Sequence, residues 1–343
     1  MKQIKGGVTA AKGYEAASTA AGIKYQGRTD MALIYSQVPC VSAGTFTTNV
    51  VKAAPVKWDR QIVDSGAGVQ AVVVNSGIAN ACTGEEGMGY CKETAEAAAK
   101  ALNIDAAGVL VGSTGVIGMQ LPMQKLVDGI QVLAGKKAEG LQSGHDAALA
   151  IMTTDTVEKE MAVEIEIGGK TVTIGGMSKG SGMIHPNMCT MLAFITTDAA
   201  ITKEALQKAL SEDVEDTYNM ISVDGDTNDT AILLANGLAG NQEITYASPE
   251  YETFKEALHM VNETLAKKMA GDGEGATALF EVKVVGAESI KQAKTLAKSV
   301  VCSNLTKAAI AGHDANWGRI LCAMGYSGVQ FDPEKESWKA SDY

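Results

Sequence analysis

The chain has 343 residues, of which 46% are hydrophobic and 20% are charged, and its formal net charge is −11. A chain of this length exceeds the size at which a single core stops growing, so we expect one large lobe or two fused lobes. The negative charge argues against nucleic acid and anionic membranes as partners, and the longest apolar runs fall short of the roughly 20 residues that span a bilayer.

The first half of the chain alternates between apolar runs and helix-forming stretches. The apolar runs predict strands at 32–35, 69–74 and 108–111, and a turn leads into a further extended piece at 44–48. Helices are predicted at 89–102, which is rich in alanine, and at 121–134, where Pro122 in the first turn costs nothing. Two alternating runs, 161–167 and 170–174, flank a Gly-Gly turn and predict a β-hairpin.

The second half has the same mixture of strands and helices. Strands are predicted at 191–195, 230–234 and 279–285. Helices are predicted at 202–220, 249–269, 288–299 and 316–324. Because strands are often adjacent in sequence, the pattern favours a layered sandwich over a doubly wound sheet.

One stretch, Lys179-Gly-Ser-Gly-Met-Ile-His-Pro-Asn-Met-Cys-Thr-Met-Leu-Ala-Phe-Ile-Thr-Thr-Asp198, joins an irregular glycine loop to an apolar strand. Gly180, Gly182 and Pro186 break regular structure in its first half, and Thr190 stands at the start of the strand. Taken alone, Thr190 reads as an ordinary β-branched residue. The whole stretch, however, resembles the signature of the ornithine acetyltransferase family, also called bifunctional glutamate N-acetyltransferase/amino-acid acetyltransferase.

The resemblance implies a chain that cuts itself between Cys189 and Thr190, after which Thr190 is the nucleophile. It further implies a layered αββα sandwich of the self-cleaving N-terminal-threonine type. Fragment 1–189 would be the alpha chain and fragment 190–343 the beta chain, folded together, in a heterotetramer of two alpha and two beta chains.

A glycine loop at Gly112-Ser-Thr-Gly115-Val-Ile-Gly118 follows a predicted strand. It imitates a dinucleotide fingerprint, but the second strand with an acidic end that such a site needs is missing. Glycines also expose backbone N–H groups that can bind an oxyanion. The resemblance implies that Thr114 and the amide of Gly115 form an oxyanion hole.

Three further positions match substrate contacts of the family. They are Thr153, with Thr154 as a close competitor, Lys179 and Glu274. From the residues alone, the glycine-rich segment around Glu274 reads as a helix end followed by a solvated turn. The resemblance implies that Glu274 contacts the substrate amine, and Lys179 suits the substrate carboxylate.

The segment Asp224-Gly-Asp-Thr-Asn-Asp229 imitates a calcium loop. An EF-hand has glycine at its sixth position and glutamate at its twelfth, where this chain has Asp229 and Ala235, so calcium is rejected. The segment resembles a family loop with two residues missing.

The six cysteines form no C-x-x-C pair, and none of the four histidines stands at metal-ligand spacing. Reduced thiols, a cytoplasmic location and no metal are therefore expected. The N-terminal segment lacks an apolar signal-peptide core.

The resemblance implies a ping-pong transfer of an acetyl group from N-acetylornithine to glutamate, in arginine biosynthesis, through an acyl-threonine. No organic cofactor is needed, and acetyl-CoA could act as a second donor. Two alternatives stay open: an N-terminal-threonine aminopeptidase that uses water as acceptor, and a truncated relative without catalysis. The second rests on the ending at Ser341-Asp-Tyr343, where family chains continue with a tail that lines the pocket.

Overall fold

The computed structural model describes residues 1–185, 191–225 and 230–332. Its strands form two sheets that share one long strand, β3 (Met31–Phe46). The first sheet runs β1 (Lys2–Ile4), β6 (Lys159–Ile167), β7 (Lys170–Lys179), β8 (Leu192–Thr197), β9 (Thr230–Ala235) and the second half of β3. The second sheet contains β2 (Tyr14–Thr19), the first half of β3, β4 (Val69–Asn75) and β5 (Val109–Ser113).

The strand β3 passes from one sheet to the other at an irregularity between Tyr35 and Cys40. Before it, Met31–Tyr35 pairs with β2 and β4; after it, Val41–Phe46 pairs with β9. The two sheets therefore face each other as layers. Their inner faces share one core cluster, to which Phe194 and Ile232 contribute from the first sheet and Ile34 and Val72 from the second.

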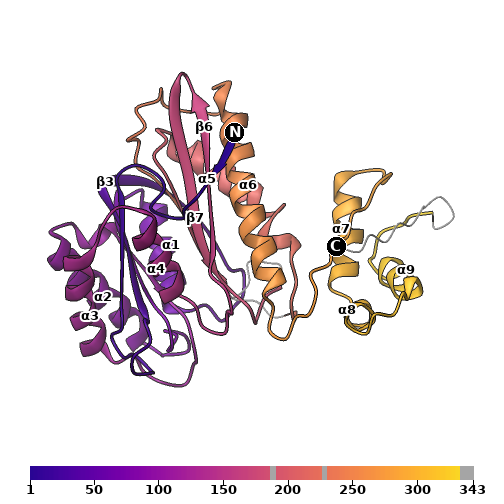
Figure 1. The fold of residues 1–343 in the computed structure, drawn as a ribbon, viewed down its shortest axis with the longest axis horizontal. Coiled ribbons are helices and arrows are strands. Elements are labelled where there is room, and N and C mark those ends of the chain that lie inside the picture. The colour runs from indigo at the N-terminus through magenta and orange to yellow at the C-terminus, as the bar shows by residue number, and fades with distance from the viewer. Residues whose placement is uncertain (186–190, 226–229, 333–343) are drawn as a thin grey trace.

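Helices cover both outer faces, as Figure 1 shows. On the first sheet, α5 (Lys203–Val214) and α6 (Glu250–Gly271) bury Leu206 and Leu258 against strand residues such as Ile195. On the second sheet, α2 (Glu86–Leu102) and α3 (Met123–Lys136) bury Ala95 and Leu126. The helices α1 (Ala54–Ser65) and α4 (Leu141–Ala150) add buried residues to the cluster between the sheets. The predicted layered αββα sandwich is confirmed.

The last three helices lie to one side of these layers (Figure 1). They are α7 (Ile290–Val301), α8 (Asn304–Ala311) and α9 (Trp317–Gly325). Leu296, Val300, Ala323 and Met324 form a small cluster of their own. Among the described residues, no helix is both long and apolar enough to cross a membrane.

Most predicted elements are present with shifted ends. The helix predicted at 202–220 ends at Val214, and a short 3₁₀ turn, η2 (Tyr218–Met220), follows. The piece predicted at 44–48 is the end of β3. The strand predicted at 108–111 is β5, which begins at Val109, because Gly108 is the last residue of a second short 3₁₀ turn, η1 (Ala106–Gly108).

The prediction of a strand at 279–285 is wrong. The segment has no regular secondary structure and forms no part of either sheet. Its alternation is nevertheless real, since Phe280, Val282 and Val284 are half-buried and the residues between them are exposed. Val282 and Val284 pack against the cluster of the last three helices, so helices, and not a neighbouring strand, receive the apolar side of the segment.

Candidate active site

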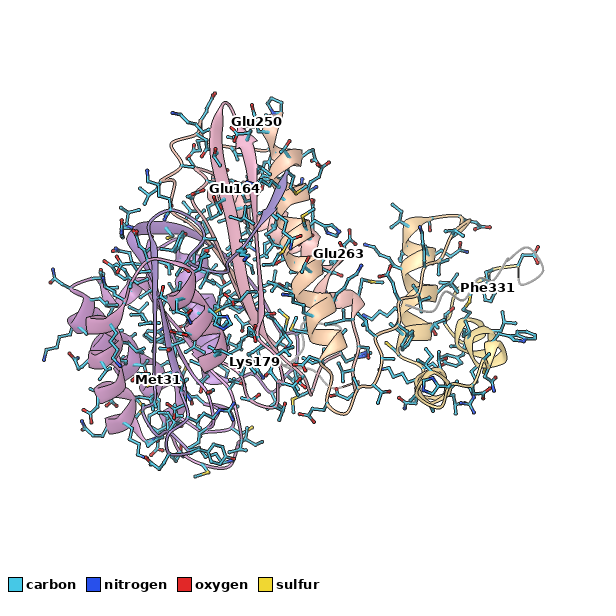
Figure 2. The ribbon with its side chains drawn as sticks, viewed as in Figure 1. Met31, Glu164, Lys179, Glu250, Glu263 and Phe331 are labelled. Atoms are coloured by element: carbon cyan, nitrogen blue, oxygen red, sulfur yellow. The ribbon has the colours of Figure 1, made fainter. Side chains whose placement is uncertain are left out.

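The candidate site lies where β7 ends and its antiparallel partner β8 begins. Lys179, the last residue of β7, pairs with Leu192, the first residue of β8. Figure 2 shows Lys179 at the lower end of β7, which is opposite the Gly168–Gly169 turn of the β6–β7 hairpin. The predicted cleavage site, Cys189 and Thr190, falls in this connection and lies outside the described residues.

The described residues next to the predicted cleavage site are well anchored. Met191 is buried, and its carbonyl accepts a hydrogen bond from the Thr230 N–H at 3.2 Å. On the other side, the carboxylate of Asp224 accepts hydrogen bonds from the N–H groups of Met183 and Ile184 at 2.5 and 2.9 Å. Asp224 therefore orders the loop before the predicted cleavage site. Residues 226–229 of the segment that imitates a calcium loop lie outside the described part of the chain.

The predicted oxyanion loop follows β5 and lies against the loop that follows β4. The Thr114 N–H donates to the Asn75 carbonyl at 3.0 Å, and the Val116 N–H donates to the Gly77 carbonyl at 3.1 Å. Gly115 has a φ of +133°, and a Cβ there would lie 2.3 Å from the carbonyl carbon of Gly77. Only glycine permits this approach of two backbones.

The two sheets meet at the candidate site through Thr114 and Lys179. The Lys179 Nζ donates to the Thr114 Oγ1 at 3.4 Å, and both residues are buried. A hydroxyl can donate its own proton while its oxygen accepts another. The Thr114 hydroxyl can therefore donate to a reacting oxygen while Lys179 holds it.

Asp155 connects two of the predicted substrate-binding segments. One carboxylate oxygen accepts the Gly180 N–H at 2.7 Å, and the other accepts the Thr153 N–H at 3.0 Å. Burial by itself raises the pKa of Asp155, but the ammonium groups of Lys179 and Lys159 outweigh burial and hold the pKa below its usual value. Asp155 is therefore an anion at neutral pH.

Thr153 and Thr154, the two candidates for one predicted substrate contact, differ in burial and in hydrogen bonds. Thr153 is half-buried, is tied to Asp155, and its carbonyl accepts a hydrogen bond from the Arg28 Nη2 at 3.1 Å. Thr154 is exposed. Thr153 is therefore the better anchored of the two residues.

Glu274 approaches the same loop from the end of α6. Its N–H donates to the Ser181 carbonyl at 3.0 Å. Its carboxylate lies against Gly182, where a Cβ would be 2.4 Å from the Glu274 Oε1. The side chain is exposed, so it can meet a ligand from solvent.

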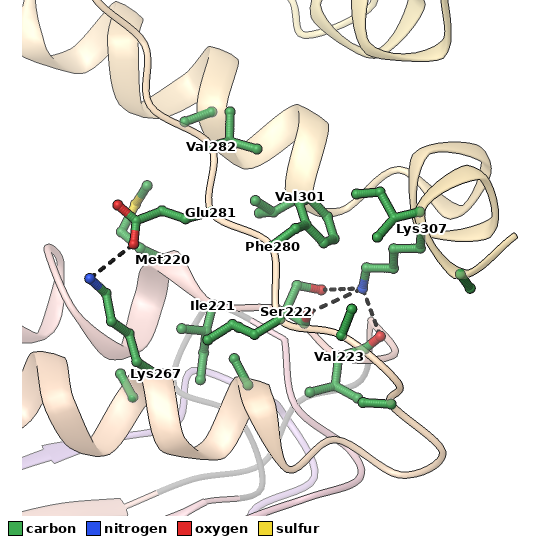
Figure 3. Close-up of a pocket in the computed structure, with 18 of the residues that line it drawn as sticks. Met220, Ile221, Ser222, Val223, Lys267, Phe280, Glu281, Val282, Val301 and Lys307 are labelled. Carbon is green, nitrogen blue, oxygen red and sulfur yellow. Dashed lines mark hydrogen bonds and ion pairs between the residues drawn. The ribbon is translucent and has the colours of Figure 1, made fainter. Parts of the chain in front are cut away.

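Glu274 also borders a cavity of about 430 Å³ between α6 and the helices α7 and α8. Figure 3 shows the polar contacts in its wall. Lys267 forms an ion pair with Glu281 at 2.9 Å, and Lys307 donates to the carbonyls of Ser222 and Val223 at 3.1 and 2.6 Å. Burial lowers the pKa of Lys307 below its usual value.

Contacts therefore link Thr114 to Lys179, Thr153 through Asp155 to Gly180, and Glu274 to Ser181, all at the end of β7 or in loop 180–184. Gly115 follows Thr114 and packs against Gly77. Sequence reasoning missed the charged side chains that hold loop 180–184: Asp155, Lys159 and Asp272. Lys159 stands in a run of charges, Val157-Glu-Lys-Glu160, that reads as a solvated surface. Within the described ranges, no group of three or more His, Cys, Asp or Glu side chains could hold a metal ion.

Comparisons with known proteins agree with one another. The ArgJ family model matches residues 15–342. The arginine biosynthesis bifunctional protein ArgJ of Symbiobacterium thermophilum is 55% identical over 337 residues, which are 97% of this chain and 83% of that protein.

Solved structures show the same fold. The crystal structure of the ArgJ protein of Bacillus halodurans is matched with a TM-score of 0.52 at 43% identity, over 54% of this chain and 96% of the solved chain. A Burkholderia β-aminopeptidase is matched with a TM-score of 0.51 over 96% of both chains, at 12% identity, which is a likeness of fold alone.

Proposed function

This chain belongs to the ArgJ family of arginine biosynthesis, and from that premise we propose that it transfers an acetyl group from N-acetylornithine to glutamate. The observation that carries the proposal is the meeting of Thr114, Lys179 and the 180–184 loop beside the connection that contains Thr190. A nucleophile at that point would have a hydroxyl donor and an ammonium within reach.

The first step is maturation. The Thr190 hydroxyl attacks the Cys189 carbonyl, and the peptide bond is exchanged for an ester. Water then hydrolyses the ester, which leaves a carboxylate on Cys189 and an α-amino group on Thr190. Asp155 and Asp224 support this step, because they hold the N–H groups of the loop that leads to the cleavage site.

The second step is acetyl transfer. The new α-amino group, with a reference pKa of about 7.7–8.0, takes the proton of the Thr190 hydroxyl as it attacks the acetyl carbonyl. Thr114 and the Gly115 amide donate to the oxyanion. Ornithine leaves with the proton, glutamate enters, and its amine takes the acetyl group from the acyl-threonine.

Two charged groups, one buried and one exposed, are proposed to bind the amino-acid substrates. Lys179 suits the carboxylate and Glu274 suits the ammonium, because each is opposite in sign to its ligand. Thr153 completes the pocket. The proposed reaction uses no cofactor, and acetyl-CoA would be a second acetyl donor at the same threonine.

The proposed product of maturation is a pair of fragments, 1–189 and 190–343, in a heterotetramer with two copies of each. The length of the solved Bacillus halodurans chain supports a division, since 54% of this chain covers 96% of it; the segment before Thr190 is a similar share. The described cysteines 40, 82, 91, 302 and 322 are all free, which supports a reducing compartment such as the cytoplasm.

Intact-mass analysis tests maturation, and an assay of N-acetylglutamate formation tests acetyl transfer by the same protein. The wild-type protein should give a fragment that begins at Thr190 and should form N-acetylglutamate. Thr190→Ala should give one uncut chain without transfer, whereas Thr190→Ser keeps the hydroxyl and should retain part of both activities. Transfer by Thr190→Ala would disprove the nucleophile. Release of acetate from the wild type with no effect of glutamate would instead indicate a hydrolase.

A further inference from the structure

A fully buried ammonium lies behind the candidate site. Lys159, the first residue of β6, has no exposed surface. Its Nζ donates to the Asp155 Oδ1 at 2.7 Å, the Asp272 Oδ2 at 2.7 Å and the Val157 carbonyl at 3.1 Å. These three acceptors match the three N–H groups of an ammonium. Because a buried charge is costly unless it is paired, the three groups form a unit of fixed geometry.

One side of this unit holds the segments that carry Thr153 and Lys179. The Asp155 oxygen that accepts from Lys159 also accepts the Gly180 N–H, and the other oxygen accepts the Thr153 N–H. Lys159 also pairs with Ser178, the neighbour of Lys179, in the sheet. A displacement of Lys159 would therefore move the carboxylate-binding side of the site.

The other side of the unit holds the segment that carries Glu274. The Asp272 carboxylate accepts the Thr156 N–H at 2.9 Å and also contacts the Thr156 hydroxyl. The Asp272 carbonyl accepts from the Ser181 Oγ at 2.6 Å. Since Asp272 is two residues before Glu274, a displacement of Lys159 would also move the ammonium-binding side.

We propose that Lys159 is a positioning residue that fixes the distance between Lys179 and Glu274, and so selects substrates by the spacing of carboxylate and ammonium. This proposal rests on the proposed function. The α-amine of N-acetylornithine is acetylated, so its only ammonium is at the end of the side chain. N-acetyllysine carries the same groups with one more methylene and is the natural probe of the spacing.

The test compares kcat/KM for N-acetylornithine and N-acetyllysine. One methylene is typically worth about 10–200-fold in discrimination by a fitted site, and we expect the wild type to prefer N-acetylornithine within that range. Lys159→Met keeps the length of the side chain and removes its charge. It should reduce the preference by about tenfold or more, because the two binding groups are no longer held at one distance.

The matched control is Lys137→Met. Lys137 forms a largely buried ion pair with Glu15 at 2.6 Å, at the border of β2 and away from the site. This variant loses a lysine and an ion pair but should keep the preference of the wild type. A purely structural role of Lys159 would lower both kcat/KM values alike and leave their ratio unchanged, which would overturn the proposal.

The pH profile gives a second readout. The charged groups that face Asp155 are Lys159 of β6, Lys179 of β7 and, across Lys159, Asp272 at the end of α6. Burial alone would raise the pKa values of Asp155 and Asp272, but Lys159 helps to hold both below the usual value. Without Lys159 these pKa values rise, so the loss of activity on acidification should begin at a higher pH in Lys159→Met than in the wild type.

A second variant applies if Lys159→Met does not fold. Asp272→Asn keeps the shape of the side chain and an oxygen for Thr156, but weakens the contact with Lys159 on the Glu274 side. It should also reduce the preference for N-acetylornithine, and an unchanged ratio would overturn the proposal. A wild type that transfers no acetyl group to glutamate would overturn the proposed function, whereas an active wild type whose variants keep its ratio would overturn this inference alone.

Discussion

At the scale of single residues, the candidate site depends on polar atoms from different layers. Thr114 follows the last strand of the second sheet, and Lys179 ends a strand of the first, yet their side chains are 3.4 Å apart. The hydroxyl accepts from the ammonium and keeps its own proton for another acceptor. The arrangement is suited to a negative charge that develops on a reacting carbonyl.

The role proposed for Thr114 leads to a prediction. Thr114→Val keeps the β-branched shape and removes the hydroxyl, and it should lower kcat by about 10²–10³, the usual cost of one oxyanion donor. KM should change little, because the charge develops only in the transition state. Steady-state kinetics with N-acetylornithine and glutamate measure both. Thr114→Ser is the control and should keep most of the turnover; a near-normal kcat in Thr114→Val would remove Thr114 from the site.

At the scale of elements, the loops after the parallel strands β4 and β5 form one structure. Ile78 and Val116 form a parallel bridge, and the Ala79 N–H donates to the Val116 carbonyl at 2.9 Å. Gly115 directly precedes Val116, and a Cβ built on it would meet the backbone of Gly77 and Ile78. The position of the proposed oxyanion donor is thus set by backbone contacts.

A substitution at Gly115 should therefore damage the fold and the activity together. The Cβ of Gly115→Ala would lie 2.7 Å or less from backbone atoms of Gly77 and Ile78, which cannot move aside as a flexible side chain can. Gly118→Ala is the matched control, because Gly118 also has a positive φ of +85° but its Cβ would meet nothing within 4 Å. Urea unfolding should show a loss of about 1 kcal/mol for Gly118→Ala and a larger loss for Gly115→Ala. Equal losses would mean that the two loops do not constrain each other.

The sequence predicts elements well where burial repeats with a clear period. The hairpin β6–β7 and the helix α6 are of this kind. The helices α1 and α4 are not predicted from the sequence. The described side chains that α4 buries are small, such as those of Ala147 and Ala148, so its apolar face gives only a weak periodic signal. The alternation at 279–285 correctly indicates one buried side, but it does not reveal whether a strand or a helix covers that side.

The predicted site residues rest on the resemblance of sequence motifs to those of a known family. In the structure, hydrogen bonds connect the segments that carry several of these residues. Thr153, Lys179 and Glu274 are far apart in sequence, and no local pattern indicates that Asp155, Lys159 and Asp272 connect them. A lysine among glutamates normally lies on a solvated surface. Its burial follows from the strand that carries it, because Lys159 pairs with Ser178 beside the site.

At the scale of the whole molecule, the two proposed fragments are interleaved. In the first sheet, β8 and β9 belong to 190–343, and they lie between β7 and β3 of 1–189. Each of the two junctions is an antiparallel ladder between the fragments. The core of that sheet also mixes residues of both fragments, such as Ile174 with Ile195 and Leu233.

Neither fragment should fold alone. Fragments 1–189 and 190–343, each expressed separately, should lack a cooperative unfolding transition, because each exposes strand edges and half of a core. After self-cleavage of the full chain, the fragments should elute together in gel filtration and separate only in denaturant. Circular dichroism and size measurement check both statements. A separately expressed fragment that unfolds cooperatively would show that the sheet is less shared than its strand order indicates.

The strand order also has a consequence for timing. On the ribosome, β3 and β7 are made before β8 and β9, which must enter the place between them. The first sheet is therefore complete only when β9, which ends at Ala235, has been synthesised. Pairing of strands so distant along a chain is slow. Until that moment, the proposed scissile bond before Thr190 tethers the late strands to the early ones and keeps their effective concentration high. A cut made before the sheet closes would turn an intramolecular search into an encounter between two molecules.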